Sequence, residues 1–180
     1  MLLSYNELCL LAEEGVINAP FSAINGSSID LTLDHVIRIE NSPLSYNTVD
    51  LIKKENINTY EISLKGTGYG LEPGEFILAS SNEIFNLPMD ISCEYKLKSS
   101  MARNGLEHLN AGWCDAGWNN SRLTLELKNM TRYHTLYLSE GMPIGQVVFF
   151  RHQTVPYEKS YAVRGQYNGQ SKVTESKGIK

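Results

Sequence analysis

The chain has 180 residues, of which 42% are hydrophobic and 20% are charged, and its formal net charge is −4. These values are typical of one globular domain, large enough to fold around a core without disulfides or a structural metal. The acidic balance provides no broad basic surface, which argues against a partner such as double-stranded nucleic acid.

Two short helices are predicted. Ser4 and Glu7 fit a capping box, and apolar residues follow at helical spacing, so residues 4–14 form the first helix. Residues 99–105 form the second, which follows a predicted strand.

Strand patterns dominate the rest of the chain. Apolar and polar residues alternate over 29–39, and further strands are predicted at 59–64, 75–80, 93–98, 123–128, 135–138 and 144–150. A turn at 72–75 precedes the strand at 75–80. Many short strands separated by Gly and Pro turns indicate an all-β barrel or sandwich. We expect this domain to cover 1–157, with a polar arm at 158–180 that is at least partly mobile when alone.

The three cysteines, Cys9, Cys93 and Cys114, are far apart and odd in number. We expect free thiols in a reducing compartment. The N-terminus lacks the pattern of a secretion signal, and no apolar stretch reaches the length of a membrane helix. A cytoplasmic location is therefore expected, without a membrane partner.

Residues 98–106 combine hydroxyl groups with positive charges. If they are helical, Ser99 and Arg103 share one face, and Lys98 and Ser100 lie beside them. Such a helix start suits a phosphate group. A capped helix facing solvent is the alternative.

Two tryptophans lie within residues 111–118, each beside a glycine. Trp113 and Trp118 could form the walls of a pocket for a base or sugar. Aromatic residues packed in the core at a strand end are the alternative.

Glu126 lies on the polar face of the strand at 123–128, opposite three leucines. Such a glutamate is usually solvated. It becomes a candidate general acid and base if another subunit or the arm covers that face and excludes water.

Residues 166–170 place a tyrosine between polar side chains in the arm, which suggests a lid that closes over a ligand; plain disorder is the alternative. The zinc deaminase pattern is absent, and the four histidines show no metal-binding spacing.

Taken together, these segments resemble the dCTP deaminase family of the dUTPase-like superfamily, nearly from end to end. The matching motifs are the opening MLLSYNEL, the S-x-D-L strand at 27–31, the turn at 71–74, KSSMARNGL at 98–106, the L-E-x-x-N strand at 125–129, I-G-Q at 144–146 and the tail at 166–170. A single motif of this kind is not specific for the family, but the occurrence of all of them in the same order is.

This resemblance implies a mainly β, dUTPase-like distorted antiparallel barrel that assembles as a homotrimer with active sites between subunits. It implies deamination of dCTP to dUTP and ammonia, with Mg²⁺ carried by the triphosphate and no zinc. The implied catalytic residues are Ser99, Arg103, Ala111, Asp115 and Glu126, with Glu126 as the proton shuttle. The implied substrate-binding residues are Lys98, Ser100, Trp113, Trp118, Gln146, Tyr167 and Gln170.

The sequence departs from the family at two cationic positions. Lys98 replaces an arginine and so loses its bidentate fork, and Gln166 replaces a lysine. Both changes weaken the grip on a triphosphate, so a variant acting on dCMP is one alternative.

A bifunctional enzyme that also cuts dUTP to dUMP and pyrophosphate is the main alternative. Ala111-Gly112-Trp113-x-Asp115 resembles that branch, and Asp115 aligns with the aspartate that activates water in trimeric dUTPases. A nucleotide sensor without catalysis is the non-enzymatic alternative. Inhibition by dTTP is common in the family, but no residue here indicates it.

Overall fold

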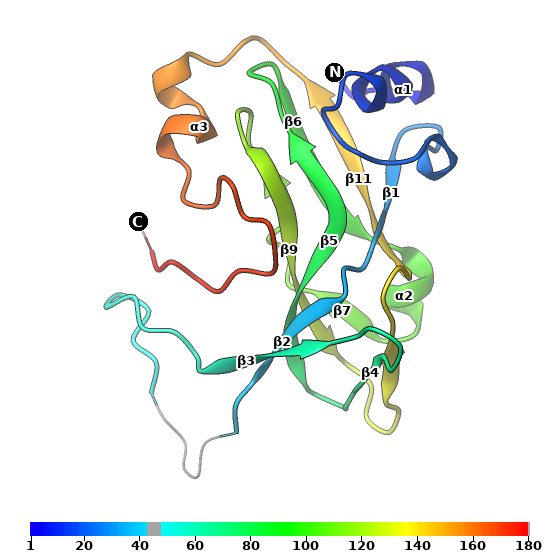
Figure 1. The fold of residues 1–180 in the computed structure, drawn as a ribbon, viewed down its shortest axis with the longest axis vertical. Helices are drawn as coiled ribbons and strands as arrows, with labels where there is room; N and C mark the ends of the chain where they lie inside the picture. Colours follow the sequence, from blue (N-terminus) through cyan, green and yellow to red (C-terminus); the bar gives the residue numbers. More distant parts are fainter. Residues whose placement is uncertain (43–47, 180) are drawn as a thin grey trace.

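The computed structural model describes residues 1–42 and 48–179, and their strands form three antiparallel sheets (Figure 1). A four-stranded sheet has the order β1–β11–β6–β8, with bounds Ile29–Thr32, Pro143–Arg151, Ile91–Leu97 and Trp113–Cys114. A five-stranded sheet has the order β3–β2–β5–β9–β7, with bounds Thr59–Ser63, Val36–Glu40, Phe76–Asn86, Asn119–Asn129 and Leu106–His108. β4 (Tyr69–Leu71) pairs with β10 (Leu136–Leu138). The mainly β class is confirmed.

Helices are few and short. They are α1 (Tyr5–Glu13), α2 (Ser99–Arg103), α3 (Tyr161–Arg164) and the 3₁₀ turns η1 (Phe21–Ala23) and η2 (Tyr157–Lys159). α1 begins as predicted, because the Ser4 N–H donates to Glu7 Oε2 over 3.0 Å. Among the described residues, no helix is long and apolar enough to cross a membrane.

The alternating pattern over 29–39 is two strands in different sheets, not one. β1 follows β11 as far as Leu33, whose N–H donates to Met142 O. The next N–H, of Asp34, donates to Ser80 O on β5. The chain thus changes sheets at 33–35, and the period of two persists because both strands face the same core.

β5 and β9 are the longest strands and form the centre of the five-stranded sheet, where Leu78 pairs with Glu126. Leu123, Leu125 and Leu127 point into the core. The alternate residues of β9 therefore face outward, as predicted for Glu126.

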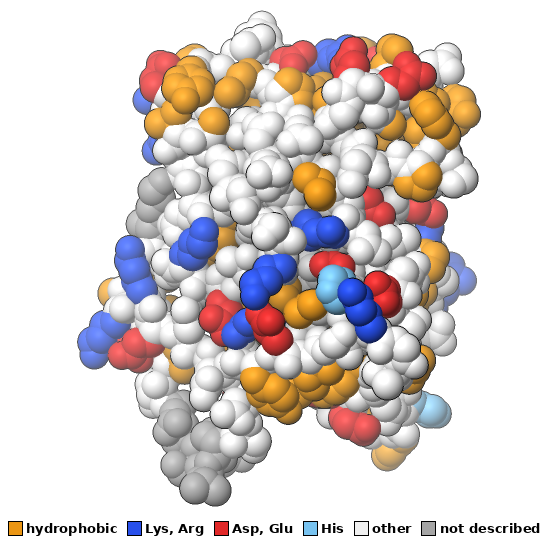
Figure 2. Space-filling view, in the orientation of Figure 1, with side chains coloured by type: hydrophobic (Ala, Val, Ile, Leu, Met, Phe, Trp, Pro, Cys, Tyr) orange, Lys and Arg blue, Asp and Glu red, His pale blue; other side chains and the backbone are white. Residues whose placement is uncertain are grey.

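The arm follows β11 and runs beside β9, at the left of the sheet in Figure 1. The Arg122 N–H donates to Gln170 O (2.9 Å), and the Thr174 N–H donates to Thr124 Oγ1 (3.3 Å). Val173 is only 2% exposed, so one apolar side chain anchors the arm. On the face shown in Figure 2, charged side chains of both signs are interspersed.

Tyr95 on β6 is a buried aromatic residue that two glycines accommodate. A Cβ at Gly145 would lie 2.0 Å from its ring, and a Cβ at Gly112 would lie 2.8 Å from its backbone oxygen. The glycine of the I-G-Q motif is therefore required by close packing between β11 and β6.

We expect Gly145→Ala to lower the free energy of unfolding by about 1–3 kcal/mol, because the added methyl group forces the buried Tyr95 ring to move. Urea unfolding monitored by circular dichroism measures this change. Gly26→Ala is the matched control, since its Cβ would meet nothing within 4 Å. Equal effects of the two substitutions would contradict the packing argument.

Candidate active site

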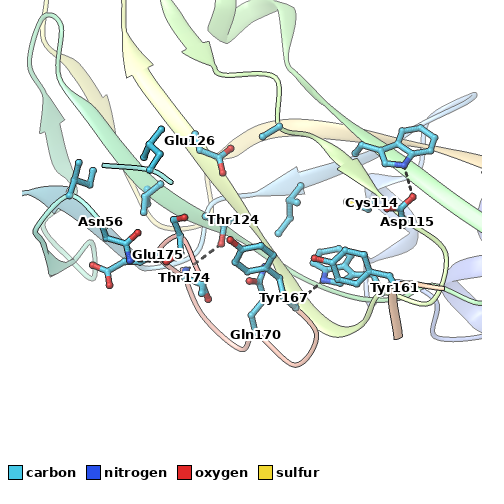
Figure 3. Close-up of a pocket in the computed structure, with 18 of the residues that line it drawn as sticks. Asn56, Cys114, Asp115, Thr124, Glu126, Tyr161, Tyr167, Gln170, Thr174 and Glu175 are labelled. Carbon is cyan, nitrogen blue, oxygen red and sulfur yellow. Dashed lines mark hydrogen bonds between the residues drawn. The ribbon is translucent and has the colours of Figure 1, made fainter. Parts of the chain in front are cut away.

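A cavity of about 550 Å³ lies on the outer face of β5 and β9, between the arm and the loop at 111–115 (Figure 3). Strand residues Phe76, Leu78, Thr124 and Glu126 line it, as does Leu51 from the connection between β2 and β3. The volume is that of a small-molecule site, and the lining is largely apolar.

Glu126 is the carboxylate on the floor of this cavity. Its side chain is 26% exposed, and its cross-strand neighbour is Leu78. Strand β9 fixes its backbone on both sides, through β5 and β7. Glu126 therefore lies on a rigid element, in a partly dry surrounding, as proton transfer requires.

The buried polar atoms that lack a hydrogen-bond partner gather at this site. Among the described residues they are His108 Nε2, Glu126 Oε2 and Gln170 Oε1. The first two lie 3.3 Å apart without forming a hydrogen bond. Because buried polar atoms are nearly always paired, these three mark a place where water or a ligand binds.

His108 lies beneath Glu126 and is held there by Tyr95. The His108 side chain is 5% exposed, and its ring centre is 4.6 Å from that of Tyr95. Burial, and secondarily the nearby Glu126 carboxylate, raises the pKa of the Tyr95 hydroxyl far above its ordinary value. Tyr95 thus stays neutral, and its hydroxyl donates to Ile144 O (3.3 Å).

The loop at 111–115 forms a second side of the cavity and carries a second carboxylate. The Trp113 indole N–H donates to Asp115 Oδ1 over 2.8 Å, which orients that carboxylate. Ala111, Trp113 and Asp115 all line the cavity. β8 in this loop pairs with β6 through Cys114 and Cys93, so the loop is attached to the four-stranded sheet.

The arm forms the third side. The Trp118 indole N–H donates to Tyr167 O (3.0 Å), and Gln170 Nε2 donates to Arg122 O (2.6 Å). The amide oxygen of Gln170, Oε1, is buried and accepts no hydrogen bond from the described residues. Tyr167 and Gln170 thus line the cavity, where the sequence analysis expected arm residues to contact a ligand.

Two sets of predicted site residues, those of the motif at 98–106 and Gln146, lie away from the cavity. Lys98, Ser99, Ser100, Arg103 and Gln146 do not line the cavity. α2 lies on the far side of β9 from the arm (Figure 1). Lys98 Nζ is 2.7 Å from Asp30 Oδ2, and the Ser28 hydroxyl donates to Gln146 Oε1 (2.9 Å). The S-x-D-L and I-G-Q motifs therefore support α2, and Ser99, Ser100 and Arg103 remain exposed.

The charged side chains that line the cavity are all acidic. Among residues 1–42 and 48–179, its lining contains four carboxylates, of Glu55, Asp115, Glu126 and Glu175, and no lysine or arginine. An anionic group gains nothing from such a lining. The cavity therefore suits a neutral ring and sugar, and a phosphate chain needs positive charge from another source.

His108 is the residue that sequence reasoning missed. It ends a strand of three residues, too short for alternation to be recognised. The only signal was a histidine between apolar positions, Leu106 and Leu109, which is more typical of ordinary core packing.

Comparisons with known proteins agree with this geometry. Residues 2–152 match the family model described as dCTP deaminase-like. A protein of Rhodococcus jostii (strain RHA1), named "dCTP deaminase, dUMP-forming", is 36% identical over 98% of this chain and 96% of its own. A protein of the same name from Mycobacterium ulcerans (strain Agy99) is 36% identical over 98% of this chain and 95% of its own.

The fold has a solved counterpart. The 2'-deoxycytidine 5'-triphosphate deaminase of Agrobacterium tumefaciens superposes with a TM-score of 0.66 at 22% identity, over 84% of this chain and 48% of that chain. The fold implied by the sequence motifs is confirmed by this likeness. With the family model covering most of its length, this chain belongs to the dCTP deaminase-like family.

Proposed function

We propose that this dCTP deaminase also hydrolyses its product, dUTP, to dUMP and pyrophosphate. The observation that carries this proposal is the presence of Glu126 and Asp115 in one cavity. Relatives named "dCTP deaminase, dUMP-forming" match over almost the whole chain, which supports the second step. Deamination that stops at dUTP, the product first expected from the sequence, becomes the alternative.

Glu126 is the proton shuttle of the first step. Its Oε2 atom accepts no hydrogen bond from the protein and faces His108 Nε2 at 3.3 Å, so it can accept a proton from a water molecule bound there. The hydroxide adds to C4 of cytosine, and Glu126 passes protons to N3 and to the departing amino group. One water is consumed and one ammonia leaves. Leu78 and Phe76 beside the carboxylate keep bulk water away.

Asp115 is the base of the second step. The bond from Trp113 fixes Oδ1 and leaves Oδ2 to orient a water. That water attacks the α-phosphorus of dUTP, and the bond to the β-phosphate oxygen breaks to release pyrophosphate. The walls formed by Trp113 and Trp118 suit the pyrimidine ring during both steps.

The phosphate chain needs positive charge that none of the described lining residues supplies, and exposed α2 offers one arginine beside two serine hydroxyls. Arg103, Ser99 and Ser100 face solvent on the far side of the barrel. A second copy of the chain in a closed ring would bring its α2 to this cavity. We therefore propose a homotrimer with each site built from two subunits.

Magnesium would arrive with the nucleotide. Among residues 1–42 and 48–179, no three His, Cys, Asp or Glu side chains gather as a metal site. Mg²⁺ is usually bound through phosphates and one or two carboxylates, and Asp115, which lines the cavity, could supply one. The metal would shield the phosphate charge from the acidic lining. We expect the enzyme to act in the cytoplasm.

We expect Glu126→Gln to lower kcat by a factor of about 10²–10⁴ with little effect on nucleotide affinity, because glutamine keeps the shape but cannot carry the proton. Ammonia release from dCTP measures turnover, and calorimetric titration measures binding. A wild-type protein that binds dCTP without releasing ammonia would favour a nucleotide sensor.

Asp115→Asn separates the two steps. We expect wild-type protein with dCTP and Mg²⁺ to form dUMP and pyrophosphate without free dUTP, and Asp115→Asn to accumulate dUTP instead. Ion-exchange chromatography of the products distinguishes dUMP from dUTP in each reaction. Free dUTP from the wild type and no effect of Asp115→Asn on the products would show a deaminase that stops at dUTP.

Subunit mixing tests the shared site. Glu126→Gln and Arg103→Ala are each expected to abolish activity alone, whereas co-expression should restore up to about a quarter of wild-type activity, since some sites then receive both native residues. Co-expression of Glu126→Gln with the double variant is the control and should restore nothing. No recovery in the first mixture would place both residues of a site in one chain.

A further inference from the structure

We propose that Arg38, which does not line the cavity, is a positioning residue that holds the closing arm over the active site. The expected effect on KM rests on the proposed function. The expected effect on the position of the arm does not. It concerns four alternating charges, Arg38, Glu61, Lys172 and Glu175, which we call the arm clamp.

Arg38 on β2 binds the barrel and the arm with one guanidinium group. Its Nη1 donates to Glu61 Oε1 and its Nη2 to Glu175 Oε1, each over 2.8 Å. Its Nε donates to Thr59 Oγ1 (2.9 Å), and the Thr59 hydroxyl donates in turn to Glu175. Two carboxylates from different segments thus share a planar fork, which a lysine could not reproduce.

The arm reaches the clamp through two further contacts. Lys172 Nζ lies 2.8 Å from Glu61 Oε1, and Asn56 Nδ2 donates to Ser176 O over 2.8 Å. These contacts flank Val173, the buried anchor of the arm. Residues 172–176 are therefore fixed to β3 and to the preceding connection by charge and hydrogen bonds on both sides.

The clamp acts on the cavity through Glu175. Glu175 and Ser176 line the cavity beside Asn56, and Figure 3 shows Glu175 near Asn56 and Thr174. The Arg38 side chain is 17% exposed, less than half the value for Glu175, so it lies beneath the arm. The position of Arg38 therefore determines where Glu175 and the arm lie along the cavity.

Charge gives the clamp a second role. The Thr59 hydrogen bond and the Arg38 charge lower the pKa of the Glu175 carboxyl, which is therefore ionised at neutral pH. Without Arg38, Glu61 would keep its contact with Lys172, but the Glu175 carboxylate would face the anionic nucleotide without its own positive partner. The closed arm would then be disfavoured, and more strongly when substrate binds. Glu126 is on another strand and keeps its surroundings.

Hydrogen exchange tests the structural part and needs no turnover. In Arg38→Met, we expect faster exchange of the amides at 172–178, while those of β9 keep wild-type protection. Trypsin should also cut faster after Lys172. Arg151→Met is the matched control, because the Arg151–Asp90 contact (3.6 Å) joins no arm residue. Unchanged exchange at 172–178 overturns the proposal, whether or not the protein has activity.

Kinetics test the consequence for catalysis. We expect Arg38→Met to raise the KM for dCTP about tenfold and change kcat less than about threefold, with an intermediate KM for Arg38→Lys. Adding Glu175→Gln to Arg38→Met should lower KM again, because no unpaired carboxylate remains. If Arg38 only stabilises the pairing of β2 with β3, Arg38→Met would lower Tm, and adding Glu175→Gln would not lower KM. That outcome would overturn the proposal. A drop in kcat at unchanged KM also overturns the proposal.

Discussion

The strict alternation of side chains along β9 is the constraint on which the rest of this structure depends. One face of the strand places Leu123, Leu125 and Leu127 in the core, so the register cannot slip without exposing all three. The same register directs Thr124 and Glu126 outward, where the arm covers them. The register that packs the core therefore also sets the position of Glu126, the proposed proton shuttle.

Tyr95 connects the four-stranded sheet to the cavity around Glu126. Its ring occupies the space left by Gly145 and lies against His108, whose Nε2 faces Glu126. Gly112 allows the loop that carries Asp115 to approach its backbone, since the Tyr95 N–H donates to Gly112 O (2.8 Å). Tyr95 therefore contacts both the loop that carries Asp115 and the histidine that faces Glu126.

The sequence was most informative where the responsible interactions are local or periodic. Ser4 and Glu7 define the start of α1 because both partners of the capping box lie within one turn. β4, β7 and β8 have two or three residues and no periodicity, so they were not predicted. The period of two placed Glu126 on the outer face. It could not show that the chain changes sheets at 33–35, since both sheets bury the same face.

Long-range geometry explains what else the sequence could not show. The motif at 98–106 and the Glu126 strand were both recognised, but only the fold shows that α2 and the cavity lie on opposite sides of one barrel. The acidic cavity and the exposed Arg103 of α2 cannot meet within one chain, but a ring of copies would bring them together with complementary charge. A dUTP molecule formed at Glu126 would remain within reach of Asp115 while the arm is closed. Retention of that intermediate, more than any new contact, would make dUMP the product, because hydrolysis would then precede release.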